Sequence, residues 1–276
     1  MSATLRFDEV SRRFRTKTRN VHALDRVTLE IRPLEFTALV GPSGCGKSTL
    51  LNIAAGLDTG YEGTFTLEPA DADRAYLFQS HRLLPWRTAQ ANVSFVLEAR
   101  GLGRSEARAT ARRYLALVGL AGCEDQFPAH LSGGMRQRVA LARALAVDPA
   151  LMLMDEPFSA LDEITAQRMR GELLDIHEIE PRTVLFVTHN LAEACYLADR
   201  VIVMASNPGR IVADVTIEVP RPRDHEDLRL AEYQRELSHS LFHHSSPTGT
   251  QTAPTTTDQP ATGPSDTTGD THHATL

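Results

Sequence analysis

Apolar and polar positions alternate with two different periods along residues 1–244. Short runs rich in β-branched residues, bounded by Gly, Pro or charge, predict strands. These are Thr4–Phe7, Val27–Ile31, Thr37–Val40, Gly63–Leu67, Ala75–Phe78, Leu151–Met154, Thr183–Val187, Val201–Met204 and Ile211–Val215. Apolar residues at helical spacing predict helices among them. These are Lys47–Ala55, Ala89–Arg100, Arg104–Val118, Gly134–Ala146, Glu163–Glu178, Leu191–Ala198 and Asp227–Leu241. Strands interleaved with helices predict an α/β fold with a mainly parallel sheet.

Two stretches depart from this alternation. Residues 88–148 hold three predicted helices and no good strand, which predicts a helical subdomain inserted into one domain that spans residues 1–244. Residues 245–276 contain eleven threonines, four prolines and no aromatic residue, lysine or arginine. Such a segment cannot bury enough apolar surface to offset its ordering entropy, so we expect a disordered tail there.

Composition narrows the class of protein. The 29 basic and 35 acidic residues give a formal net charge of −6, which does not favour a nucleic-acid partner. No apolar run reaches the roughly 18 residues of a membrane span, and the N-terminus lacks the apolar core of an export signal. Three scattered cysteines fit a reduced compartment rather than a disulfide framework or a zinc site. We therefore expect a cytoplasmic protein.

A glycine-rich loop lies between the strand that ends at Val40 and the helix predicted after it. The loop comprises Gly41, Pro42, Ser43, Gly44, Cys45, Gly46, Lys47, Ser48 and Thr49. This is the spacing of a P-loop, whose glycines let backbone N–H groups wrap phosphate oxygens at a helix N-terminus. Lys47, one of only two lysines, is expected to reach the β- and γ-phosphates, and the Ser48 hydroxyl to ligate Mg²⁺.

Two acids end the apolar strand Leu151–Met154. If that strand is buried in the sheet, Asp155 lies at its carboxyl edge beside the phosphate loop, where a carboxylate can hold Mg²⁺. Glu156 is then placed to orient or deprotonate an attacking water. The alternative is an ordinary strand end with acids that face solvent, which a P-loop upstream makes the weaker interpretation.

A second glycine pair stands at the start of a helix. Ser132, Gly133 and Gly134 have the composition of another anion-binding nest. The segment Leu131–Met135 resembles the signature motif of the ATP-binding-cassette (ABC) family, and the resemblance extends over about residues 4–244. It implies ATP and Mg²⁺ as ligands. It also implies a P-loop (RecA-like) core, an N-terminal antiparallel β region and the inserted helical subdomain.

The resemblance also suggests roles for four further residues. Gln79 is similar to the glutamine that contacts Mg²⁺ and the attacking water, and His189 to the histidine that contacts the γ-phosphate. Asp162 ends a segment similar to the loop that lines the interface between two cassettes. Phe14 is expected to stack on adenine, although it is also compatible with a place in the core. In this family two cassettes close head to tail around two ATP molecules, so we expect a homodimer.

Further motifs resemble one group of importers, those for nitrate, sulfonate, taurine and bicarbonate. The motifs are residues 78–87, 206–211 and 219–224. The resemblance implies a transmembrane permease subunit, an indirect partnership with a periplasmic or lipid-anchored solute-binding protein, and a place at the cytoplasmic face of the membrane. The permease is expected to dock near Leu83–Arg87, and the alternative for Trp86 is burial in the helical subdomain.

One residue departs from the signature motif, and two other functions compete with transport. Met135 stands where the family usually has Gln and cannot donate the equivalent hydrogen bond, so we expect modestly weaker closure of the dimer. A soluble ABC ATPase that acts on DNA or ribosomes is the first alternative, although such proteins usually fuse two cassettes or carry inserts absent here. A P-loop kinase is the second, but it has no use for a second nest at Ser132.

Overall fold

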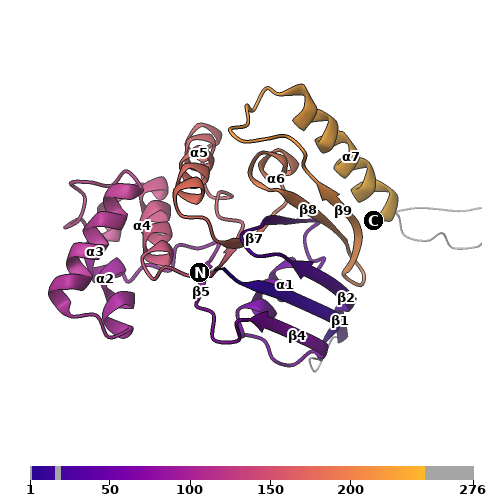
Figure 1. Ribbon diagram of the computed structural model, residues 1–276, viewed down its shortest axis with the longest axis horizontal. Helices are drawn as coiled ribbons and strands as arrows, with labels where there is room; N and C mark the ends of the chain where they lie inside the picture. Colours follow the sequence, from indigo (N-terminus) through magenta and orange to yellow (C-terminus); the bar gives the residue numbers. More distant parts are fainter. Residues whose placement is uncertain (1, 16–19, 246–276) are drawn as a thin grey trace, which may run out of the picture. The chain divides into compact units, whose positions relative to one another are not determined.

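The computed structural model describes residues 2–15 and 20–245. Three long strands form an antiparallel sheet in the order β2–β1–β4 (Figure 1). They are β1 (Thr4–Arg15), β2 (Asn20–Ile31) and β4 (Glu62–Glu68). This sheet is the expected N-terminal antiparallel region.

The first two strands are much longer than the sequence predicted. Their pairing shifts register between Phe7 and Arg13, and Glu9 and Arg26 adopt positive φ angles of 51° and 44°. Each bulge moves the following side chains to the other face of the sheet, so the apolar alternation loses its phase. For that reason the pattern indicated only residues 4–7 and 27–31.

The second sheet has six strands in the order β5–β6–β7–β3–β8–β9. The strands are β3 (Phe36–Val40), β5 (Arg74–Leu77), β6 (Leu151–Asp155), β7 (Thr183–Thr188), β8 (Arg200–Ala205) and β9 (Arg210–Thr216). The first five pair in parallel, and β9 pairs antiparallel with β8. The mainly parallel α/β sheet is confirmed.

Successive residues of the central strands are buried on opposite faces of this sheet. Ala38, Met152 and Phe186 belong to one apolar cluster, while Leu39 and Leu153 belong to another. Because both faces are covered, these strands read as continuous apolar runs. Helix α1 (Lys47–Ala54) and the antiparallel sheet contribute to the second cluster, and the remaining helices contribute to the first.

Three helices between β5 and β6 pack on one another as the inserted helical subdomain. They are α2 (Ala89–Ala99), α3 (Arg104–Leu117) and α4 (Gly133–Leu145), with a short 3₁₀ turn at Pro128–His130. Helices α5 (Glu163–Ile179), α6 (Leu191–Leu197) and α7 (Leu228–Ser245) complete the chain described. Helix α7 runs four residues beyond its predicted end, and residues 246–276 of the expected tail lie outside the described residues. Within the described part, no helix is both long and apolar enough to cross a membrane.

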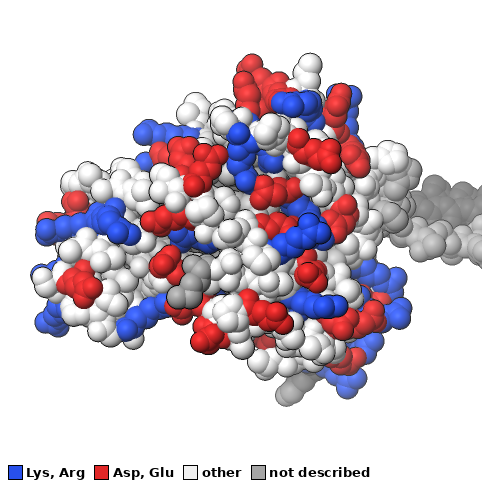
Figure 2. All heavy atoms as spheres, viewed as in Figure 1, with Lys and Arg blue, Asp and Glu red and all other residues white. Residues whose placement is uncertain are grey.

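Charges of both signs are mixed over the surface. In the face drawn in Figure 2, basic and acidic side chains alternate without a large area of one sign. This distribution offers no extended basic stripe on that face, which a nucleic-acid duplex would need.

A buried arginine holds the segment that leads into α7. The Arg223 guanidinium is 7% exposed and donates to the carbonyls of Cys195, Ala198 and Val219 at 2.9, 2.6 and 2.8 Å. Burial lowers the pKa of Arg223 to about 10, so the side chain stays charged at neutral pH. The residue lies in the 219–224 motif, and its contacts give that motif a structural role.

Replacing this arginine tests that role. We expect Arg223→Met to lower the free energy of unfolding by about 3 kcal/mol, because several buried carbonyls lose a charged donor. Chemical denaturation measures the change. Arg229→Met is the matched control, because Arg229 is 60% exposed and pairs with Asp227 at the surface. Equal denaturation midpoints for the two variants would contradict the anchoring role.

Candidate functional site

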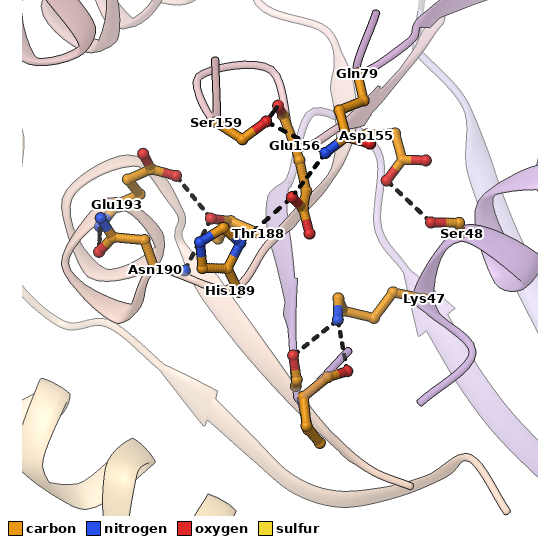
Figure 3. Close-up of polar contacts among 12 residues, drawn as sticks. Lys47, Ser48, Gln79, Asp155, Glu156, Ser159, Thr188, His189, Asn190 and Glu193 are labelled. Carbon is orange, nitrogen blue, oxygen red and sulfur yellow. Dashed lines mark hydrogen bonds and ion pairs between the residues drawn. The ribbon is translucent and has the colours of Figure 1, made fainter. Parts of the chain in front are cut away.

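The carboxyl ends of three neighbouring strands bring the predicted site residues together. The P-loop follows β3, Asp155 ends β6, and His189 follows β7 directly. These strands are adjacent and parallel in the sheet, so the residues after them meet at one edge. Figure 3 shows the resulting group of side chains.

Close packing and backbone conformation explain the loop's glycines. A Cβ on Gly41 would lie 2.5 Å from the carbonyl oxygen of Met204, and Gly46 has a φ of 98° and stands at the N-terminus of α1. Lys47 is 6% exposed, and its ammonium donates to the carbonyls of Gly41 and Pro42 at 2.7 and 2.9 Å. The lysine charge is therefore held inside the turn of the loop (Figure 3).

A cavity of about 470 Å³ opens beside this loop. Phe14, Lys47, Ser48, Gln79 and Glu156 all line it, together with Val21, Ala23, Ser43, Gly44, Gly46 and Thr49. The cavity thus joins an aromatic ring from the antiparallel sheet to the phosphate loop and to two residues after the parallel strands. The Phe14 ring is half-buried and carries the Arg12 guanidinium 4.3 Å above its centre.

A hydroxyl and a carboxylate meet at the base of the P-loop. Ser48 Oγ donates to Asp155 Oδ1 at 3.1 Å, and the Tyr76 hydroxyl lies 3.4 Å from Asp155 Oδ2 and 3.3 Å from Asn52 Oδ1. Burial raises the pKa of Asp155, and the hydrogen bonds from Ser48 and Tyr76 oppose that rise. Burial also raises the pKa of Tyr76. Oxygen donors around a partly buried carboxylate are the ligands that Mg²⁺ prefers, so these residues fit the expected metal.

Glu156 is the centre of a second set of contacts. Its Oε2 lies 3.2 Å from Gln79 Nε2, which donates, and 3.3 Å from His189 Nδ1. Its backbone has a φ of 44°, and its N–H donates to the carbonyl of Val187 at 2.9 Å. Ser159 Oγ donates to the Glu156 carbonyl at 3.0 Å. Glu156 therefore contacts both Gln79 and His189, which the sequence also indicated, within one chain (Figure 3).

Asp155 and His189 do not line the cavity themselves but contact residues that do, Ser48 and Glu156. The predicted residues at the starts of α4 and α5 are also absent from the cavity lining. Ser132 begins α4 and accepts a hydrogen bond from the Met135 N–H at 3.2 Å. Asp162 begins α5 and accepts from the Thr165 N–H at 3.0 Å, which holds the pKa of Asp162 low. Within one chain both side chains cap helices. Gly133 and Gly134 open α4 next to Ser132 and are likewise absent from the cavity lining.

The sequence pattern did not indicate Tyr76 as part of the site, and it left the place of Trp86 open. Tyr76 lies in β5, and the sequence pattern marks it only as an alternate position in a short strand. Trp86 is 71% exposed, so the alternative that it is buried in the helical subdomain is wrong.

Together the fold and the cavity define a nucleotide-binding protein of the P-loop class. A family model described as ABC transporter matches residues 24–159. An uncharacterized ABC transporter ATP-binding protein of Methanocaldococcus jannaschii is 45% identical over 87% of this chain and 92% of its own length. An aliphatic sulfonates import ATP-binding protein of Rhizobium johnstonii is 47% identical over 83% of this chain and 87% of its own length.

Two solved structures agree with these relatives. A dimeric bacterial ABC transporter cassette has a TM-score of 0.70 and 31% identity, and it covers 78% of this chain and 100% of its own. A dimeric post-hydrolysis state of an ATP-binding cassette, bound to ADP and Pi, has a TM-score of 0.69 and 30% identity with the same coverage. The chain belongs to the ABC transporter ATP-binding family, and it is an ATP hydrolase.

The Tyr76 hydroxyl allows a direct test of the proposed metal site. Tyr76→Phe keeps the ring and its stacking on Phe78, whose centre is 4.2 Å away, but removes the hydroxyl next to Asp155. We expect the Mg²⁺ concentration for half-maximal ATPase activity to rise about tenfold, because a partner that orients a ligand is lost. Tyr114→Phe, in α3, is the control. A Mg²⁺ titration identical to that of the unmodified protein would contradict the assignment.

Proposed function

We propose that the cavity binds ATP with Mg²⁺ and hydrolyses it at the γ-phosphate. The observation that carries this proposal is the single cavity lined by Phe14, the P-loop, Gln79 and Glu156. The loop's N–H groups and the Lys47 ammonium hold the phosphates, and Phe14 stacks on the adenine. Ser48, Asp155 and Gln79 supply the oxygen ligands of Mg²⁺, which neutralises phosphate charge when bound.

Within this proposal Glu156 is the general base. Gln79 and His189 both contact Oε2, which leaves Oε1 to accept a proton from the attacking water. The oxygen of that water attacks the γ-phosphorus, and the bond to the β-γ bridging oxygen breaks, which yields ADP and phosphate. Lys47 and His189 stabilise the charge on the transferred group, and Glu156 then releases its proton to solvent.

The site of one chain is half of the proposed functional unit. Ser132, Gly133, Gly134 and Asp162 stand apart from the cavity, although their glycines and helix N-terminus suit phosphate oxygens. We infer that a second copy of the chain supplies these residues to the γ-phosphate, so that two copies enclose two ATP molecules. The dimeric state of both similar cassettes supports this arrangement.

Replacing the carboxylate of the proposed base by an amide separates ATP binding from ATP hydrolysis. Glu156→Gln is expected to lower turnover by at least about 100-fold, because the amide cannot accept the proton. ATP affinity should be retained, so the ATP-bound dimer should accumulate. Light scattering in the presence of ATP detects that dimer, and the unmodified protein is the control. Turnover close to that of the unmodified protein would remove Glu156 from the mechanism.

We further propose that hydrolysis energises a membrane importer. A transmembrane permease would be the direct partner, and a solute-binding protein outside the membrane the indirect one, with the cassettes at its cytoplasmic face. The exposed Trp86 in the segment Leu83–Arg87, just past Gln79, supports a docking surface there. We propose a small solute of the nitrate, sulfonate and taurine group, and the names of two relatives, both aliphatic sulfonates import ATP-binding proteins, support a sulfonate among these.

Purification from the native cells distinguishes this proposal from its alternative. The tagged chain, extracted in a mild detergent, should bring a multispanning membrane protein with it. A solute-binding protein encoded beside that partner can then be titrated with sulfonates, taurine and nitrate. Recovery with ribosomes or DNA-repair proteins, and without a membrane protein, would favour the soluble ABC ATPase. The family and structural matches lend that alternative no support.

A further inference from the structure

A buried ion pair lies behind the site. Arg170 in α5 is 2% exposed and Glu193 in α6 is 8% exposed. Arg170 Nη1 donates to Glu193 Oε1 at 3.2 Å. A buried ion pair often stabilises a fold no better than apolar side chains of the same size, because both charges lose their hydration. The role of this pair is therefore sought in the residues that it contacts rather than in the stability of the fold.

The second oxygen of Glu193 leads to His189. Thr188, the last residue of β7, donates its hydroxyl proton to Glu193 Oε2 at 2.7 Å, and the same hydroxyl accepts from the Asn190 N–H at 3.0 Å (Figure 3). Asn190 Oδ1 accepts from the backbone N–H groups of Ala192 and Glu193 at the start of α6. Thr188 and Asn190, the residues on either side of His189, are thus each held by hydrogen bonds.

The His189 ring itself is much less constrained. Its side chain is 61% exposed, and Nδ1 lies 3.3 Å from Glu156 Oε2. An exposed ring is held mainly by the backbone that carries it. The distance between His189 and Glu156 therefore depends on the turn that Thr188 and Asn190 define.

The other end of the ion pair reaches the start of α5. Arg170 Nη2 donates to a carboxylate oxygen of Glu163, the first residue of that helix, directly after Asp162. A cavity of about 160 Å³ separates this helix start from the His189 turn, and Glu156, Glu163, His189 and Glu193 are among the residues that line it. Arg170 and Glu193 connect the two sides of the cavity.

We propose that Arg170, Glu193 and Thr188 are positioning residues: they hold His189 against Glu156 and tie that placement to the N-terminus of α5 beside Asp162. The inference rests on the proposed role of His189 in hydrolysis. It adds that a displacement at Asp162, where a second chain is proposed to approach, reaches the base through Arg170 and Glu193. The α5 terminus and the histidine turn then move together.

Variants of Thr188 test this with little change in shape. Thr188→Val removes the hydroxyl and keeps a β-branched side chain, whereas Thr188→Ser keeps the hydroxyl. We expect Thr188→Val to lower kcat about 10- to 100-fold, as a misplaced catalytic group does, with the KM for ATP within about twofold. Thr188→Ser should retain most of kcat. Equal kcat values for both variants would overturn the proposal, as would a loss of thermal stability that accounts for all of the lost activity.

Variants of the ion pair test its far end. Arg170→Met, or Glu193→Gln if that protein does not fold, should lower kcat with little effect on the KM for ATP. Arg168→Met is the matched control, because Arg168 is 73% exposed on the same helix and pairs with Glu172. The proposal would be overturned if both variants had the same kcat as the Arg168→Met control.

His189→Ala separates this proposal from the one on which it rests. Adding Thr188→Val to His189→Ala should leave the residual rate unchanged within about twofold, because Thr188 acts through His189. A further tenfold loss would overturn the positioning role. Full turnover in His189→Ala alone would instead overturn the proposed role of His189 in ATP hydrolysis.

Discussion

The site depends on the parallel register of three neighbouring strands. Strands β6, β7 and β3 lie side by side, with Asp155 opposite Val187 and Val40 opposite Thr188. Because each chain segment leaves the sheet at the same edge, the loops after these strands have little freedom in where they begin. Residues more than 100 positions apart, such as Ser48 and Asp155, therefore reach hydrogen-bond distance. The fold itself thus positions the phosphate loop, the carboxylates and the histidine.

Glu156, directly after β6, adopts a strained backbone conformation at this edge of the sheet. Its positive φ costs about 1 kcal/mol or more for a residue with a Cβ, and the hydrogen bond to Val187 together with the Ser159 contact holds it there. The carboxylate is thereby turned toward Gln79 and His189. Strain of this kind is common where a side chain must point into a site. The contacts with Gln79 and His189 are both made at Oε2.

The sequence marked the local parts of the candidate site, because each one is a short motif at a strand end. The P-loop, Asp155 and Glu156 needed only their own motifs and the assumption of a parallel sheet, which the structure confirms, whereas His189 was indicated by the resemblance to the ABC family. The lengths of β1 and β2 could not be predicted from the sequence, because bulges at Glu9 and Arg26 interrupt the alternation of apolar and polar residues. Tyr76, Arg170 and Glu193 were missed for a different reason. The Tyr76–Asp155 and Arg170–Glu193 contacts join residues 79 and 23 positions apart, so no local pattern marks them.

A half-site in each chain is the central claim, and mixing two inactive variants tests it most directly. Lys47→Ala removes the phosphate-loop lysine, and Ser132→Arg blocks the opposite helix start. Each alone should be inactive. In a mixed dimer one site has an intact loop from one chain and an intact Ser132 from the other, so an equal mixture should regain up to about a quarter of full ATPase activity. A mixture as inactive as its components, with mixed dimers demonstrably formed, would contradict the account, and so would full activity of Ser132→Arg as a monomer.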